Sequence, residues 1–275
     1  MRFTPFSFIT PTPPPILIEY LVVGGGGSGG AANTSDASAF DRAGGGGAGG
    51  FKSGSLFLTS SISYAVSVGT GAPRISALNQ SGTNGSGSTF GPISVSGGGG
   101  GGYATAGSAG GSGGGGGIST GQVGQAGGAG TSGEGFTGAA GFKSGTCPGG
   151  TCVLQPGPGG GARSAATSSA TFWVEGQPQQ WLDGNYYSRG GYCDGMGAGT
   201  TTLKGIGGTG RINSIVGTEA GGQGGSTSNA GPGGHGIVKV RYSGSIALFT
   251  GGDVEVSGGY VYHTFGTGSF TFASI

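Results

Sequence analysis

The hydrophobic positions of this chain gather into short runs, most of them near its two ends. Residues 16–23 (Ile-Leu-Ile-Glu-Tyr-Leu-Val-Val) form a nearly continuous apolar run rich in β-branched side chains, which predicts a strand buried on both faces. Residues 236–242 alternate apolar and basic positions and predict a half-exposed strand. Other short runs bounded by turn residues predict strands at 55–59, 63–68, 93–96, 253–256, 260–265 and 269–273. The last three are separated by turns of hairpin length, which predicts a C-terminal meander.

Glycine fills most of the chain between these runs. There are 76 glycines among 275 residues, about four times the ordinary frequency. Because glycine costs about 1 kcal/mol per residue in a helix interior, this composition excludes long helices, coiled coils and most α/β enzyme folds. Runs such as 24–27 and 97–102 follow predicted strands directly and lack the Gly-X-Y period of collagen.

Recurrent glycine blocks can be ordered as polyglycine II helices, which share the polyproline II geometry of three residues per turn. Without Cβ atoms such helices can approach closely and join their backbone groups, and a seven-residue block would span roughly 22 Å. A flexible linker is the alternative, although one or two longer tracts would suffice for a tether. We therefore expect an all-β fold with little or no helix, in which a β-sandwich of short strands is combined with a polyglycine II helix bundle.

The charge content is low and balanced. The chain has eleven Lys and Arg residues and ten Asp and Glu residues, for a net charge of +1, and the basic residues form no cluster in the sequence. We therefore expect no nucleic-acid partner, and the absence of an 18-residue apolar run predicts no membrane insertion. The proline-rich residues 1–15 predict an extended arm whose aromatic side chains suit insertion into a partner; a frayed terminus is the alternative.

Glycine-based catalytic motifs do not indicate an active site in a chain this rich in glycine. G-x-S-x-G and G-x-G-x-x-G patterns occur trivially and outside a βαβ unit, and no nucleophile, base and orienter come together. We expect no enzyme activity and no cofactor. His263, in the middle of a predicted strand, is expected to be structural rather than a general base. Asp253 and Glu255 share one face of a strand, where they could hold a cation or form a solvated edge that discourages aggregation.

The three cysteines leave the redox compartment open. Cys147 and Cys152 bracket a turn sequence and could form a local disulfide, whereas Cys193 has no obvious mate. We expect no metal site, because four clustered ligands are absent and the two histidines, His235 and His263, lie far from the cysteines in sequence.

Aromatic residues gather in one window of the glycine-rich region that contains both tryptophans. Tyr and Trp among Gly, Ser and Asn are typical of recognition surfaces, so these residues are candidates for receptor binding. The alternative is that the rings form a hydrophobic core that caps the glycine blocks. The candidates are Phe172, Trp173, Trp181, Tyr186, Tyr187 and Tyr192.

Three motifs in series resemble the glycine-rich domain of tailed-bacteriophage tail and tail-fibre proteins. They are Glu-Tyr-Leu-Val-Val-Gly-Gly-Gly-Gly at 19–27, Val-Ser-Val-Gly-Thr-Gly at 66–71, and Gly-Gly-His-Gly-Ile-Val-Lys-Val-Arg-Tyr at 233–242. The resemblance covers about residues 16–242 and extends to polyglycine II tail-fibre adhesins. In similar sequences a segment like 257–265 precedes the first motif, whereas here it ends the chain. We therefore expect the C-terminal meander to complete the sheet begun by residues 16–23, within one chain or by strand donation to a neighbour.

The resemblance implies a virion structural protein, exposed to the extracellular environment, that contributes to host attachment through its aromatic loops. It implies a glycine-rich domain at 16–242, which the sequence pattern places between the proline-rich arm at 1–15 and the C-terminal meander at 243–275. The expected partners are copies of the same chain, other virion proteins through the arm, and a host cell-surface glycan or protein. One alternative is a purely structural capsid-decoration or filament subunit, and another is ice binding by a flat glycine lattice.

Overall fold

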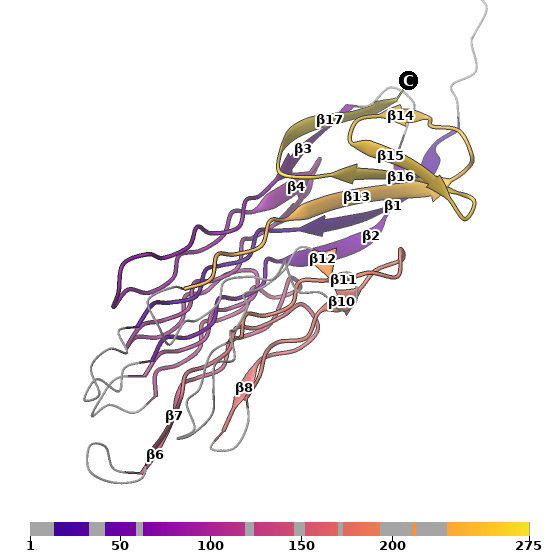
Figure 1. Cartoon of the computed structure of the whole chain (residues 1–275). Helices are drawn as coiled ribbons and strands as arrows, with labels where there is room; N and C mark the ends of the chain where they lie inside the picture. Colours follow the sequence, from indigo (N-terminus) through magenta and orange to yellow (C-terminus); the bar gives the residue numbers. More distant parts are fainter. Residues whose placement is uncertain are drawn as a thin grey trace, which may run out of the picture.

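Two large sheets and a region of glycine-rich segments make up the molecule. The structure, a computed structural model, describes residues 14–32, 42–58, 63–118, 124–145, 152–169, 173–192, 211–212 and 230–274. The sheets lie at one end and the glycine-rich segments run away from them side by side, so the molecule is elongated (Figure 1). Every regular element among the described residues is a β-strand, which confirms the all-β expectation, and no helix there could span a membrane.

The first sheet is antiparallel throughout and has the strand order β15-β16-β13-β1-β2. Its strands are β1 (Ile16–Val23), β2 (Phe51–Leu58), β13 (Ile237–Ser243), β15 (Asp253–Ser257) and β16 (Tyr260–Phe265). The apolar run at 16–23 is thus a strand, as predicted, and its Val23 lies opposite both Phe51 and Ile237. Asp253 and Glu255 are exposed on the edge strand β15.

The second sheet is also antiparallel, with the order β14-β17-β3-β4-β5. Its strands are β3 (Ser63–Val68), β4 (Ser88–Phe90), β5 (Ile93–Val95), β14 (Phe249–Thr250) and β17 (Gly268–Ser274). The C-terminal strands therefore divide between two sheets of one chain: β16 joins the sheet of β1 through β13, whereas β17 crosses over and pairs with β3.

The main hydrophobic core lies between the two sheets. Phe272 of β17 is fully buried there, with its ring stacked on Phe249 at 4.7 Å and edge-on to Phe90 at 5.8 Å. Ile18 and Val240 of the first sheet belong to the same cluster. Removing a buried Phe side chain from such a core costs about 3–5 kcal/mol, so this cluster contributes strongly to the stability of the sheet end.

His263 of β16 is buried in this core as a neutral side chain. Its Nδ1 lies 2.8 Å from the carbonyl oxygen of Gly251, so Nδ1–H donates there, and Nε2 accepts from the Tyr242 hydroxyl at 3.2 Å. The Tyr242 hydroxyl in turn accepts the Leu248 amide at 2.8 Å. Burial lowers the pKa of His263 by more than the hydrogen bond to Gly251 raises it. The expectation of a structural histidine agrees with this placement.

Glycine-rich segments continue from the strands and are joined by backbone hydrogen bonds. Within residues 24–31, successive N–H groups donate in rotation to three neighbouring segments, residues 44–50, 80–86 and 231–234. The donor and acceptor pairs, with N···O distances of 2.8–3.2 Å, are Gly24–Gly50, Gly27–Gly47, Gly30–Gly44; Gly25–Ser86, Ser28–Thr83, Ala31–Gln80; and Gly26–Gly234, Gly29–Gly231. Each neighbour is therefore met at every third residue.

These segments approach one another too closely for side chains at most positions. A Cβ at Gly27 or Gly113 would lie closer than 3.0 Å to backbone atoms of Gly99 or Gly128, respectively. Buried Ala48 and Ser112 mark positions at which a small side chain does fit. Glycine is thus required here by close backbone contact.

Short hairpins complete the described chain. They are β6 (Phe142–Gly145) with β7 (Cys152–Gln155), β8 (Thr167–Ser168) with β9 (Trp173–Val174), and β10 (Gln179–Gln180) with β11 (Tyr186–Tyr187) and β12 (Arg211–Ile212). The β6–β7 hairpin lies at the end of the glycine-rich segments remote from the sheets, whereas β10 and β11 lie beside β2 (Figure 1).

Candidate functional site

The outer face of the first sheet, which points away from the main core, carries a group of charged and aromatic side chains. Alternate residues of β1 and β13 point to this face because side chains alternate along a strand. Register places Glu19 opposite Arg241 and Leu21 opposite Lys239. Arg241 is itself opposite Tyr262 of β16. Glu19 and Arg241 are 222 positions apart in sequence, so only the pairing of β1 with β13 brings them together.

The β10–β11 hairpin folds over part of this face. Its loop closes with a turn in which the Gly184 amide donates to the Trp181 carbonyl at 3.0 Å, and Gly184 has a φ of 80°. Asp183 Oδ1 accepts the Asn185 amide at 3.0 Å, the hydrogen bond of an Asx-turn. The sequence Leu-Asp-Gly-Asn thus shapes a local turn, which points Trp181 and Tyr187 into a second cluster with Leu21, Val23 and Ile237.

Asp183 anchors the hairpin to the sheet through a buried ion pair. Its Oδ2 accepts Lys239 Nζ at 2.6 Å and the Tyr187 hydroxyl at 2.6 Å. Burial raises the pKa of Asp183, but the hydrogen bonds from Lys239, Tyr187 and Asn185 lower it by more, so its pKa lies below the ordinary value. The carboxylate is therefore ionised at neutral pH, and its charge offsets that of Lys239.

Arg241 makes the second ion pair of this face. Its Nε donates to Glu19 Oε2 at 2.6 Å, and its Nη1 donates to the Leu182 carbonyl at 3.0 Å and to the Tyr262 hydroxyl at 3.3 Å. The guanidinium also lies 4.2 Å from the ring centre of Tyr260, a cation–π contact. Burial lowers the pKa of Arg241, but these partners raise it by more.

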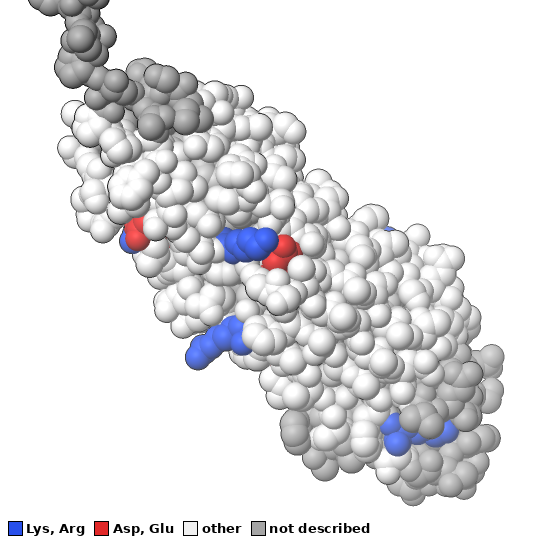
Figure 2. All heavy atoms as spheres, turned by 180° about the vertical axis from the view of Figure 1, so that it is seen from behind, with Lys and Arg blue, Asp and Glu red and all other residues white. Residues whose placement is uncertain are grey.

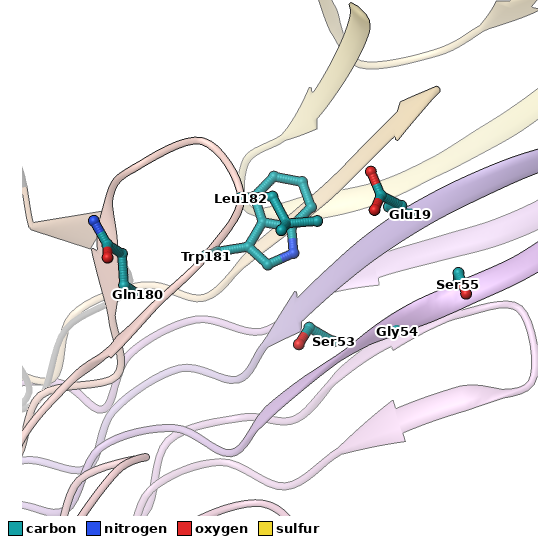
Figure 3. Close-up of a pocket in the computed structure, with 7 residues that line it drawn as sticks. All are labelled: Glu19, Ser53, Gly54, Ser55, Gln180, Trp181 and Leu182. Carbon is teal, nitrogen blue, oxygen red and sulfur yellow. The ribbon is translucent and has the colours of Figure 1, made fainter. Parts of the chain in front are cut away.

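Two hollows flank Glu19 on this face, each with a volume of about 310 Å³. Figure 3 shows the first, where Trp181 and Leu182 of the hairpin lie across from Glu19 of β1 and from Ser53 and Ser55 of β2. The second lies on the other side of Glu19 and is lined by Leu17 and Tyr260 among others. Glu19 lines both hollows.

Trp181 brings an unpaired donor to the first hollow. The side chain is 6% exposed, and its buried Nε1 has no hydrogen-bond partner among the residues that the structure describes. An unsatisfied buried donor costs about 1–3 kcal/mol, so this N–H is expected to find an acceptor when one is offered. The neighbouring Leu182 is 51% exposed at the rim.

The predicted aromatic candidates are divided by the structure. Trp181 and fully buried Tyr187 pack against the first sheet, so their rings are not free surface residues. Tyr186 is 42% exposed, and Tyr192 is half-buried. The backbone of Trp173 lies in β9, whereas Phe172 lies outside the described residues.

The cysteine predictions fall largely outside the described residues. The backbone of Cys152 begins β7 opposite Gly145, but Cys147 and Cys193 are not described, so the disulfide between Cys147 and Cys152 stays a prediction. Among the described residues, no group of three or more His, Cys, Asp or Glu side chains gathers at a position suited to a metal ion.

The prediction for β13 was wrong. Its alternating basic residues predicted a half-exposed strand, yet Lys239 and Arg241 are 8% and 9% exposed. The hairpin and the carboxylates of Asp183 and Glu19 cover both cations, and neither acidic residue stood out in the sequence. The only local signal was the pair of basic residues at alternate positions of an otherwise apolar strand.

The profile of a family described as a glycine-rich domain matches residues 6–243. The chain belongs to this glycine-rich domain family. No curated protein and no solved structure matches the chain. The matched glycine-rich domain includes β1, β2, the hairpin and the glycine-rich segments, and it ends with the last residue of β13, Ser243. The strands β14–β17 that extend both sheets follow the matched range.

Proposed function

We propose that the glycine-rich segments form a bundle of polyglycine II helices. A helix with three residues per turn presents every third N–H on the same side. The N–H groups of residues 24–31 meet three neighbours with this period, and residues 44–50 repeat it toward residues 96–102, through Gly44–Gly102, Gly47–Gly99 and Gly50–Ser96. A bundle of this kind is rigid because each helix is tied to several others by backbone bonds.

On this basis the chain is a non-catalytic structural protein of a bacteriophage virion, in a tail fibre or surface appendage, that contributes to host attachment. The observation that carries the proposal is the elongated, backbone-bonded glycine-rich region that separates the sheets from the β6–β7 hairpin (Figure 1). A rigid spacer of this form suits an appendage that holds a recognition surface away from its attachment point. The resemblance of the three motifs to tail and tail-fibre proteins supports the same role.

The surface fits a role that does not depend on charge. The face in Figure 2 carries few Lys, Arg, Asp or Glu side chains, and interactions there are therefore little affected by salt. Of the predicted aromatic candidates that the structure describes, exposed Tyr186 and half-buried Tyr192 are the ones we propose to contact a host glycan or protein.

A purely structural filament or capsid-decoration subunit is the second candidate. The burial of Trp181 and Tyr187 favours it, because those aromatics stabilise the fold and leave fewer rings for a receptor.

Immunogold electron microscopy of the assembled particles with an antibody to this chain tests the location. Gold at a tail tip or appendage is expected, and gold absent from all particles would refute a virion role. Adsorption assays then separate the two candidates: purified chain added to host cells before infection should reduce phage adsorption if it binds the receptor. Unchanged adsorption, together with gold on the capsid or along a filament, would establish the structural role instead.

A further inference from the structure

The two hollows beside Glu19 combine hydrogen-bonding groups of both polarities. Trp181 Nε1 is a donor that has no partner within the described part of the chain. The carboxylate of Glu19 is an acceptor: its Oε2 accepts a hydrogen bond from Arg241, and the Glu19 side chain is partly exposed. Ser53 and Ser55 present exposed hydroxyls, which donate and accept. A ligand that fits this set carries several hydroxyl groups.

The charges of the site are already balanced. Arg241 pairs with Glu19, and Lys239 pairs with Asp183. An anionic or cationic ligand would have no unpaired opposite charge to meet, so the site favours a neutral ligand.

Apolar groups line the same hollows. Leu182 is 51% exposed beside the first hollow, and Leu17 is 50% exposed beside the second. Tyr260 adds an aromatic ring to the wall of the second. A ring that has hydroxyls at its edge and C–H groups on its faces can use both kinds of wall.

We propose that these hollows bind a neutral saccharide. Its hydroxyls bond to Glu19 and to the serines of β2, and one of its oxygens accepts the Trp181 N–H, since Trp181 lines the same hollow (Figure 3). The site lies on the first sheet, and Tyr186 is not among the residues that line either hollow. Its role as a receptor site rests on the proposed function, whereas the binding itself does not.

Trp181 itself reports on binding. The chain has two tryptophans, so the Trp173→Phe variant leaves Trp181 as the only indole. Titrating this variant with glucose, galactose and N-acetylglucosamine is expected to give a saturable change in its emission with at least one sugar in the millimolar range. A blocked neutral peptide, acetyl-Ser-Gly-Ser-amide, is titrated in parallel.

Ser55→Leu, made in the same background, fills the first hollow from the exposed edge strand β2 and is expected to weaken sugar binding about tenfold or more. Ser94→Leu is the matched control, because Ser94 is exposed on β5, an edge strand of the other sheet. Thermal melts confirm that all variants fold. The proposal is overturned if no sugar changes the emission, if only the peptide does, or if Ser55→Leu binds like the control.

These results are separable from those on the particle. Sugar binding by the purified chain, with no gold on any virion, would retract the phage role and leave the saccharide site standing. Gold on the virion without sugar binding would support the phage role and overturn the saccharide site.

Discussion

Gly47→Ala tests whether the glycine-rich region is held by close backbone contact. Gly47 donates to Gly99 O at 2.7 Å, and its own oxygen accepts Gly27 N at 2.9 Å, so it lies between segments. A Cβ there would lie 2.6 Å from Gly113 O and closer still to Ser112 O. Because ordinary contact begins near 3.5 Å, the neighbouring backbone would have to move by about 1 Å.

The expected loss follows from what holds that neighbour. Ser112 N and Gly113 N donate to the Ala48 and Phe136 carbonyls at 3.0 Å each, so a shift strains both bonds. Overpacking costs about 1–3 kcal/mol, and a buried backbone group that loses its partner adds about 1–3 kcal/mol. Alanine lowers the conformational entropy of the unfolded chain relative to glycine, which offsets about 0.4–1 kcal/mol of this loss. We expect a net loss of about 2–4 kcal/mol, or roughly 5–15 °C in Tm.

Differential scanning calorimetry at one fixed scan rate measures this loss. Gly266→Ala is the matched control, because Gly266 has no heavy atom within 4 Å of its built Cβ, and its Tm should stay near that of the wild type. A Gly47→Ala protein that melts with the wild type, or a control that falls equally far, would refute close packing as the reason for glycine.

Three further predictions concern the sheet end. Asp183→Asn should lower the free energy of unfolding by about 3–5 kcal/mol in urea titrations, because it leaves Lys239 buried without its charge partner. Since the pKa of Asp183 is lowered in the folded protein, the stability that this ion pair contributes should be present above about pH 4 and lost as the pH falls below it. Only the wild type should show this loss, because the variant has no carboxylate at position 183. The pKa of His263 is also lowered in the folded protein, so the unfolded chain binds a proton at this side chain more readily, and the free energy of unfolding should fall as pH drops below about 6.5. His263→Gln should remove this dependence of the free energy of unfolding on pH. An unchanged dependence would mean that another group titrates. Phe272→Ala should cost about 3–5 kcal/mol, whereas Phe57→Ala, at a side chain 66% exposed, should cost far less in the same denaturation assay.

Local sequence determined the strands and where they give way to glycine. The apolar run at 16–23 is long and β-branched enough to specify β1 without knowledge of its neighbours, and the glycine that follows leaves only extended, closely packed backbone as an ordered option. His263 could likewise be placed as a structural residue, because its strand neighbours are aromatic and β-branched. Hydrophobic pattern and residue propensity act over a few neighbouring residues, so the amino-acid sequence alone is enough to predict these features.

The tertiary structure alone decided which strands pair and which side chains are covered. Glu19 meets Arg241 across 222 positions, and the apparent exposure of Lys239 and Arg241 is reversed by a hairpin whose Asp183 is 56 positions away from Lys239. The same hairpin buries Trp181 and thereby creates the hollow beside Glu19. Burial and charge pairing depend on contacts between distant segments, and those contacts exist only once the sheets have formed.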